Sequence, residues 1–186
     1  MSKKYEITKE GTLFQQPYLT LDPFTGRSSQ VMIYRIRALR DIPRFGVKAG
    51  DLGGWIQNEE NLSQDFFCWI HRSSVVLGDA RVVGNSYIGD DSLVHGEAVV
   101  TGNCFVYESN IGGKSKIVGN SVVSKVKSDK SIIHNSFINL KKSKFNDLDF
   151  NCHNVKIDRL VNKSFHIDKE YQNRKNNQLQ VKEYII

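Results

Sequence analysis

The sequence contains few cysteines and no long hydrophobic run. Its three cysteines, Cys68, Cys104 and Cys152, form no Cys-X-X-Cys pair, and no Cys/His pair has the spacing of a structural zinc site. An odd number of cysteines without a secretory leader argues against a disulfide framework, so we expect buried free thiols. No apolar segment follows Lys3 and Lys4 or reaches the length of a membrane span, which predicts a soluble, cytoplasmic protein without membrane contact.

Charge is unevenly distributed along the 186 residues, whose net charge is +6. Residues 61–112 carry two basic and six acidic groups, whereas residues 113–186 carry fifteen basic and seven acidic groups. Such an asymmetry bears on the choice of partners rather than on the fold. The apolar content of 39% and the charged content of 25% are ordinary for a globular protein with its own core.

A six-residue repeat occupies the middle of the chain. One position holds a small residue, at Cys68, Ser74, Ala80, Ser86, Ser92, Ala98 and Cys104. Two residues later comes an aliphatic residue, at Ile70, Val76, Val82, Ile88, Val94, Val100 and Val106. The next spacing, from Cys104 to Ser109, is one residue shorter. The repeat then continues with the pairs Ser109/Ile111, Ser115/Ile117 and Ser121/Val123. Two linked series that stay in register for this long indicate a structural repeat.

A period of six fits neither an amphipathic helix nor a long alternating strand, and it predicts a β-helix. Each hexad supplies one short strand and one corner, and three hexads close a coil. The aliphatic and small side chains fill the interior, while corner pairs such as Gly84-Asn85 tolerate left-handed backbone. The expected stacks are Ile70 with Ile88 and Val106, Cys68 with Ser86 and Cys104, and Asn85 with Asn103. Coils lie about 4.8 Å apart, which separates the two repeat cysteines too far for a disulfide.

The segments that flank the repeat divide the chain further. Residues 1–60 contain two alternating apolar stretches around a turn, which predicts a β-hairpin cap, and residues 61–124 form the regular β-helix. No Gly or Pro follows Gly119, and aliphatic and aromatic residues then recur about every five positions. Residues 125–168 are therefore predicted to continue the solenoid irregularly, with a separate packed segment as the alternative. Residues 169–186 are a tail or a capping strand, since an open β-helix end needs cover.

Three consecutive stretches carry a family resemblance. They are "IYRIRALRDI" (Ile33–Ile42), "VKAGDLGGWIQNEENLSQ" (Val47–Gln64) and the hexads that follow. Their order resembles the YdcK-type hexapeptide-repeat proteins of bacteria and phages, over about Ile33 to Val123. The resemblance implies an all-β fold, a left-handed parallel β-helix with an N-terminal β cap and irregular C-terminal coils. The left-handed winding of such a β-helix departs from the usual right-handed crossover between parallel strands, and the six-residue period does not predict it. Proteins of this type are often labelled acyltransferases, although their own activity is poorly defined.

Catalysis would require a base that the regular repeat does not offer. Hexapeptide acyltransferases usually act as trimers and use a histidine near a loop inserted between hexads. The hexads from Cys68 to Val106 contain no insertion, so we expect no catalytic residue. The weak candidate is His95, which lies at an outward corner. It would act as the general base in acyl transfer from acetyl-coenzyme A. The spacing of His71, His95 and His134 predicts no shared metal site, and no cofactor is expected.

Lysines of the C-terminal third are the candidate binding residues. They are Lys125, Lys127, Lys130, Lys141, Lys142 and Lys144. On one face they would meet phosphates or an acidic protein surface, and aromatics such as Phe137 and Phe145 would stack on bases. The alternative is a solvated lysine face with phenylalanine in the core.

Taken together, these patterns favour a non-enzymatic, rigid binding or scaffold protein that acts through protein–protein contacts. Fixed rows of side chains bind without a large loss of loop entropy. We expect a protein partner, together with a homodimer or homotrimer formed through one face. Because similar sequences occur in phages, one hypothesis is a phage or prophage protein that antagonises a host defence protein. Acyl transfer from acetyl-coenzyme A and nucleic-acid binding are the alternatives.

Overall fold

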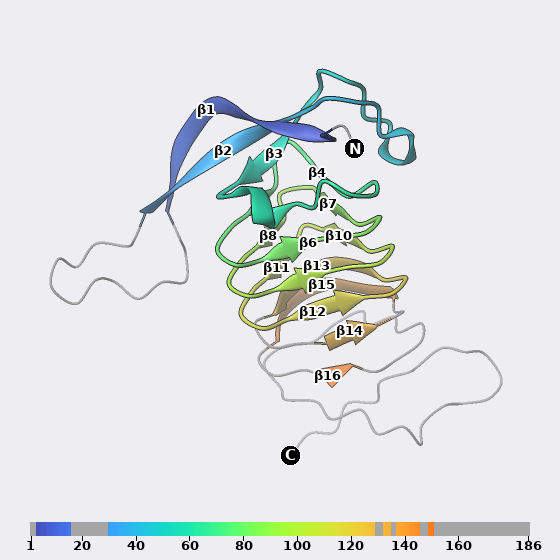
Figure 1. Cartoon of the computed structure of the whole chain (residues 1–186). Coiled ribbons are helices and arrows are strands. Elements are labelled where there is room, and N and C mark those ends of the chain that lie inside the picture. Colours follow the sequence, from blue (N-terminus) through green and yellow to red (C-terminus); the bar gives the residue numbers. More distant parts are fainter. Residues whose placement is uncertain (1–2, 16–29, 129–131, 135–136, 146–148, 151–186) are drawn as a thin grey trace, which may run out of the picture.

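A computed structural model describes residues 3–15, 30–128, 132–134, 137–145 and 149–150 of the chain (Figure 1). The described part is all-β apart from two short 3-10 helices, η1 (Pro43–Phe45) and η2 (Glu59–Asn61). Its strands are β1 (Tyr5–Gln15), β2 (Gln30–Ala38), β3 (Leu52–Ile56), β4 (Trp69–Ile70), β5 (Val75–Val76), β6 (Arg81–Val82), β7 (Tyr87–Gly89), β8 (Leu93–Val94), β9 (Val99–Val100), β10 (Phe105–Tyr107), β11 (Asn110–Ile111), β12 (Lys116–Val118), β13 (Val122–Ser128), β14 (Ile132–His134), β15 (Phe137–Phe145) and β16 (Asp149–Phe150).

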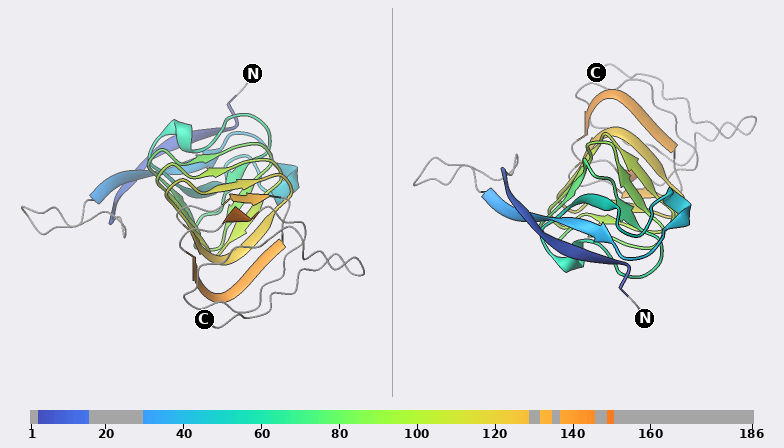
Figure 2. Two further views of the ribbon diagram at one scale, coloured as in Figure 1. Left: turned by 90° about the horizontal axis from the view of Figure 1, so that it is seen from below. Right: turned by 90° about the horizontal axis from the view of Figure 1, so that it is seen from above.

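From β3 onward the strands wind into a parallel solenoid with three faces (Figure 2). The first face consists of β3, β5, β8, β11 and the end of β13. The second face consists of β6, β9, β12, β14 and β16. The third face consists of β4, β7, β10 and the start of β13. Each strand pairs with the strand one coil away, which confirms the predicted parallel β-helix.

The predicted stacks of the eighteen-residue coil are present. Ile88 pairs with Ile70 on one side and with Val106 on the other. The side chain of Asn85 donates a hydrogen bond from Nδ2 to Oδ1 of Asn103 over 3.1 Å. The series Cys68, Ser86 and Cys104 is fully buried. Both of these cysteines are free thiols, as predicted, and Cys152 lies outside the described residues.

The aliphatic and small residues of the repeat fill the coil interior. All seven aliphatic residues from Ile70 to Val106 are buried, and each buried Val or Ile stabilises the fold by roughly 1.5–3 kcal/mol. The interior serines bond to the backbone; the Ser92 hydroxyl donates to the carbonyl of Gly89 over 2.6 Å. At the corners, Gly102 has a φ of 100°, and a Cβ there would approach the carbonyl of Gly119 to 2.4 Å. No other residue fits that position without displacing the next coil.

The spacing of the coils becomes irregular toward the C-terminal end. Val106 pairs with Val123, seventeen residues later, and Ile117 pairs with Ile133, sixteen residues later. Val123 pairs with Ile138 after fifteen residues, but the register of β13 and β15 shifts after Ser124, and Ile133 pairs with Phe150 after seventeen residues. Strands β14, β15 and β16 therefore pair in parallel with the preceding coils at irregular spacing, and the predicted domain bounds stay a prediction. The remainder of the predicted irregular region, and the tail 169–186, lie outside the described residues.

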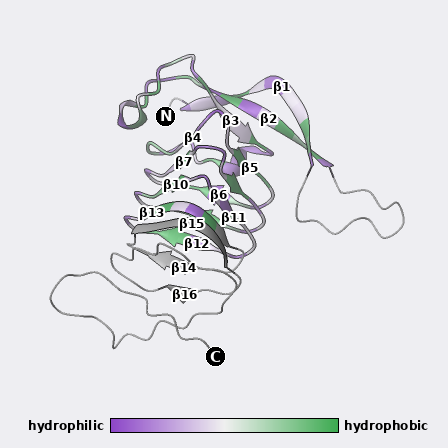
Figure 3. Ribbon diagram, turned by 180° about the vertical axis from the view of Figure 1, so that it is seen from behind, coloured by the Kyte–Doolittle hydropathy of each residue, from purple (hydrophilic) through white to green (hydrophobic). Residues whose placement is uncertain are grey.

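An antiparallel hairpin of β1 and β2 joins the N-terminal end of the solenoid through β3. Polar and apolar residues alternate along it (Figure 3). The apolar side includes Ile33, which packs with Val75 and Leu77 against the outer surface of the first face. The predicted turn between the two strands lies among residues 16–29, outside the described part.

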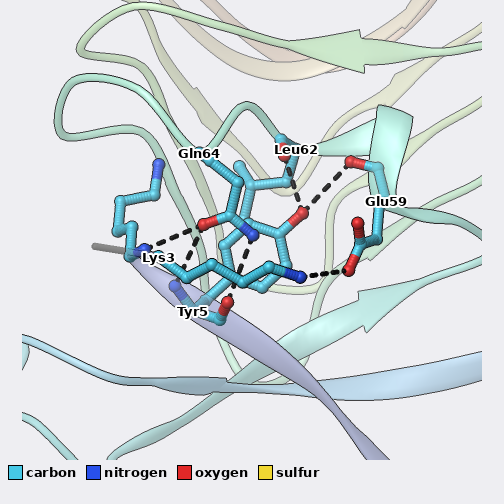
Figure 4. A network of polar contacts seen from close by, with 6 residues as sticks. Lys3, Tyr5, Glu59, Leu62 and Gln64 are labelled. Atoms are coloured by element: carbon cyan, nitrogen blue, oxygen red, sulfur yellow. Dashed lines mark hydrogen bonds and ion pairs between the residues drawn. The ribbon is translucent and has the colours of Figure 1, made fainter. Parts of the chain in front are cut away.

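Polar side chains close the open end of the first coil (Figure 4). The Tyr5 hydroxyl lies 2.7 Å from the carbonyl oxygen of Leu62 and 3.1 Å from that of Glu59. Gln64 accepts hydrogen bonds from the backbone amides of Lys4 and Tyr5 through Oε1, and donates one to the Tyr5 carbonyl through Nε2. Since no further coil lies above, these contacts satisfy backbone groups that would otherwise be unpaired.

Candidate protein-binding surface

One corner of the first coil is longer than its successors. Leu62 pairs with Val82, and Ile70 pairs with Ile88. Eight positions therefore separate Leu62 from Ile70, whereas six separate Val82 from Ile88 one coil later. The first coil carries two additional residues between the second and third faces. In solenoid proteins, insertions of this kind commonly lie on the binding surface.

Two adjacent phenylalanines lie in this insertion, and we call them the Phe66–Phe67 corner. Phe66 is 61% exposed and Phe67 is 45% exposed, beside the exposed Asp65. A single exposed apolar residue is ordinary, whereas two consecutive exposed phenylalanines add apolar surface at one corner. Aromatic residues at such positions are typical of protein–protein contacts.

The backbone of this corner is strained. Phe66 has a φ of 57°, in the left-handed region. The corresponding corners of the next coils carry glycine, at Gly84, Gly102 and Gly119, with φ angles of 71°, 100° and 76°. A residue with a Cβ in this conformation costs roughly 1–2 kcal/mol. Phe66 therefore weakens the fold where glycine would not, and its exposed ring provides little packing in return. Unfavourable backbone geometry of this kind concentrates at functional sites.

Further aromatic rings cover the third face, which begins two residues after Phe67. We call Phe45, Tyr87, Phe105 and Tyr107 the aromatic face. The ring of Phe45, from η1, lies 4.9 Å from that of Tyr87 and 5.8 Å from that of Phe105. Tyr107 stacks on Phe105 at 6.2 Å. All four are half-buried, so the aromatic face offers a firm apolar surface.

Polar groups border the aromatic face. The guanidinium of Arg44 lies 5.8 Å from the ring centre of Phe45 and 5.8 Å from that of Phe105. Burial raises the pKa of Tyr87 and of Tyr107, and the nearby Asp90 raises both further. Both hydroxyls consequently stay protonated near neutral pH and remain hydrogen-bond donors. Aromatic residues and arginine are enriched together at protein interfaces.

The candidate base His95 lies at the end of β8, on the outer surface of the first face. Its Nε2 is 2.9 Å from Oδ1 of Asn110. Because an amide oxygen only accepts hydrogen bonds, Nε2 carries the proton in this contact, and the acceptor of a neutral ring is then Nδ1. The long corner at Phe66 lies between the second and third faces, so the insertion does not bring a loop beside His95.

The described histidines His71 and His134 lie apart from His95. His71 follows β4 on the third face, 6.5 Å from the ring of Tyr87, and bonds to the Ser73 hydroxyl over 2.9 Å. His134 ends β14 on the second face. The three histidines thus occupy three different faces. Within the described ranges, no group of three or more His, Cys, Asp or Glu residues has a geometry that would hold a metal ion.

Five of the six candidate lysines lie in two described strands of the solenoid, β13 and β15. Lys125 lies at a corner with a φ of 60°, and its Nζ is 3.5 Å from a carboxylate oxygen of Glu108. Lys127 and Lys144 are register partners in β13 and β15. Lys141 and Lys142 fall within β15, and Lys130 lies outside the described residues. The proposed basic surface therefore stays a prediction.

Comparison with known proteins yields one informative relative. No family model matches the chain. The chain is similar to the uncharacterized acetyltransferase YdcK of Escherichia coli (strain K12), with 30% identity over 93 residues. This match covers 50% of the present chain and 26% of YdcK, so the chain spans about a quarter of that relative's length. The chain carries the hexapeptide-repeat β-helix that the resemblance to YdcK-type proteins predicts. No helix among the described residues has the length and apolar character that a membrane crossing requires.

The spacing of the repeat does not indicate the Phe66–Phe67 corner. Residues 61–67 belong to the predicted regular β-helix, but the regular hexad series begins only at Cys68, so it places no corner before that residue. A signal was present in the sequence: Leu62 is an aliphatic residue eight positions before Ile70. Extending the frame backward with a two-residue insertion would have placed both phenylalanines at a corner.

Proposed function

We propose that the protein is a non-enzymatic binding protein whose Phe66–Phe67 corner and aromatic face contact another protein. The observation that carries this proposal is Phe66 itself: a bulky, exposed residue in a left-handed backbone position that neighbouring coils give to glycine. A feature that weakens the fold without a packing gain is expected where function requires it.

The partner that fits this corner has an apolar pocket on a protein surface. Two exposed aromatic rings bury well in such a pocket, and a rigid coil presents them without a large loss of conformational entropy. The exposed carboxylates of Glu59, Glu60 and Asp65 lie in the same end of the molecule. Their charge disfavours an anionic phosphate or lipid surface and favours a pocket with a basic rim.

The second candidate function is acyl transfer from acetyl-coenzyme A, which the similarity to YdcK favours. The position of the insertion speaks against it, because the long corner lies between the second and third faces and not beside His95 on the first face. Isothermal titration with acetyl-coenzyme A separates the two functions. We expect no saturable binding; micromolar binding that is lost in His95→Ala would replace the binding-protein proposal with the enzymatic one.

Site-specific photocrosslinking tests the binding proposal directly. p-Benzoylphenylalanine at position 67 samples the corner, and the same residue at position 81, exposed on the second face, is the matched control. In cells that naturally carry the gene, we expect a discrete protein adduct from position 67 and none from position 81. Equal adducts at both positions, or adducts with lipid alone at position 67, would overturn the proposal.

The narrower hypotheses stay predictions within this proposal. An adduct between two copies of the chain would favour a homo-oligomer, and an adduct with a host protein would allow the partner to be identified by mass spectrometry. The idea that this host protein belongs to a defence system is tested at that step, because the described surface carries no motif that selects one.

A further inference from the structure

Lys4 is a lysine with no solvent exposure, and its Nζ atom lies against a cysteine. Both Lys4 and Cys68 are 0% exposed. The Nζ atom of Lys4 donates to Sγ of Cys68 over 3.0 Å and to the carbonyl of Ser63 over 2.6 Å, with the carbonyl of Asp65 at 3.4 Å. Lysine is rarely buried completely unless each of its protons has an acceptor. The three contacts therefore hold Nζ in one place, directly against sulfur.

The two residues join segments that are distant in sequence. Lys4 directly precedes β1 of the N-terminal hairpin, whereas Cys68 is the small residue of the first coil. Gln64 fixes the backbone of Lys4 and Tyr5 beside the same corner. Neither residue needs to move far for Nζ and Sγ to reach bonding distance.

We propose that Lys4 and Cys68 form a covalent cross-link when a peroxide oxidises Cys68. In the first step the thiol sulfur displaces water from hydrogen peroxide and becomes a sulfenic acid, with peroxide as the two-electron oxidant. In the second step the neutral Lys4 amine attacks that sulfur, the S–O bond breaks, and the hydroxyl leaves with the amine proton as water. Thiol, amine and peroxide thus give one S–N bond and two waters, the same condensation that a backbone nitrogen undergoes with a sulfenic acid.

The protonation states agree with the second step and make the first step slow. Burial lowers the pKa of Lys4 from its ordinary 10.5, which favours the neutral amine that acts as nucleophile. Burial also raises the pKa of Cys68, and the nearby Lys4 only partly opposes this. A buried, protonated thiol reacts slowly with peroxide, so the cross-link should accumulate over long exposure rather than at once.

Cys104 is the internal control for this chemistry. It is equally buried, but its Sγ lies near the carbonyls of Thr101 and Gly119, at 3.1 and 3.5 Å, and no amine is among its contacts. A peroxide that oxidises both thiols should therefore join only Cys68 to a lysine.

The experiment treats the full chain with hydrogen peroxide, alkylates the remaining thiols after denaturation, and analyses a chymotryptic digest by mass spectrometry. We expect a joined peptide containing Lys4 and Cys68, two hydrogens lighter than its parts, which dithiothreitol separates. The folded variant Lys4→Met should give no joined peptide, and Cys104 should form none with any lysine. Cys68 that stays a thiol, or that becomes sulfinic acid without a joined peptide, would overturn the proposal. A joined peptide that keeps one peroxide oxygen would also contradict the direct S–N bond.

Discussion

Phe66 and Gly84 hold corresponding corner positions, two residues before the buried Cys68 and Ser86, with φ angles of 57° and 71°. The two coils therefore make nearly the same left-handed turn with very different residues. At Gly84 the turn is free of strain, and at Phe66 it places an aromatic ring in solvent. This contrast is the reason to regard the corner as a contact surface rather than as part of the cap's packing.

The contrast predicts that Phe66→Gly stabilises the protein. Removing the Cβ from a left-handed residue should raise the free energy of unfolding by about 1 kcal/mol, and the midpoint of thermal unfolding by roughly 2–4 °C for a chain of this length. Differential scanning calorimetry measures both. The matched control is Gly84→Ala, which should destabilise, because a Cβ there would lie 2.8 Å from the carbonyl of Gly102. A lower midpoint for Phe66→Gly would mean that the ring packs more than its exposure indicates.

The inward and outward positions of one hexad give a second prediction. Val94 is fully buried in the coil, whereas the neighbouring His95 is only half-buried on the outer surface. Val94→Asp should prevent stable folding, because it buries an unpaired carboxylate. His95→Ala should change stability far less, since the contacts of His95 lie on the outer surface, where a hydrogen bond contributes about 1 kcal/mol. Circular dichroism during thermal unfolding compares the two, and equal midpoints would contradict the register of the repeat.

Lys4 gives a third prediction, about the closed end of the solenoid. Lys4→Met should lower the free energy of unfolding by roughly 1–3 kcal/mol, because it removes the shorter of the two hydrogen bonds to the Ser63 carbonyl and leaves only the Cys68 thiol at 3.4 Å. Lys3→Met is the control: the Lys3–Glu59 ion pair is exposed, and such pairs contribute little. Urea unfolding monitored by tryptophan fluorescence measures both. If the two variants lose the same stability, Lys4 does not cap the first coil as described.

The buried thiols give a prediction for alkaline pH. Burial raises the pKa of Cys104 above its ordinary 9.0, so the folded protein keeps a proton that the unfolded chain releases. The folded state then binds more protons, and stability falls as the pH rises above about 9. Cys68 and Tyr5 act in the same direction, whereas Lys4, whose pKa is lowered, acts in the opposite one. Cys104→Ser removes one of these thiols and keeps a small residue that the repeat uses at Ser86.

Urea unfolding at neutral pH and near pH 10 measures this effect. The variant Cys104→Ser should lose less stability between the two conditions than the native chain does. An identical loss in both proteins would show that Cys104 ionises in the folded state as readily as in the unfolded chain.

The regular coils were predictable because their geometry repeats. Because Ile70, Ile88 and Val106 are spaced by eighteen residues, a coil of that length stacks them above one another. The alternation of side chains along each strand then identifies the interior residues. The same spacing predicts the corners and the stack of asparagines. The corner at Phe66 was not predictable in the same way, because the two-residue insertion between Leu62 and Ile70 breaks the six-residue spacing before the regular series begins at Cys68.

The contacts between distant segments were not predictable from spacing. Phe45 lies on Tyr87 and Lys4 lies on Cys68 because the hairpin and η1 fold back over the first coils. No periodicity links these positions, and only the three-dimensional path of residues 3–15 and 30–61 brings them together. The sequence indicated that a cap was required, but not which side chains would form it.

The most direct test of the account compares the affinity and the stability of one variant, Phe66→Ser/Phe67→Ser. Isothermal titration would use the partner identified by crosslinking from position 67, with His95→Ala as control. We predict that the double variant weakens the Kd by about 100-fold or more, as expected for loss of aromatic anchors, while its thermal midpoint does not fall and His95→Ala binds like the native chain. An unchanged Kd in the double variant would contradict the account.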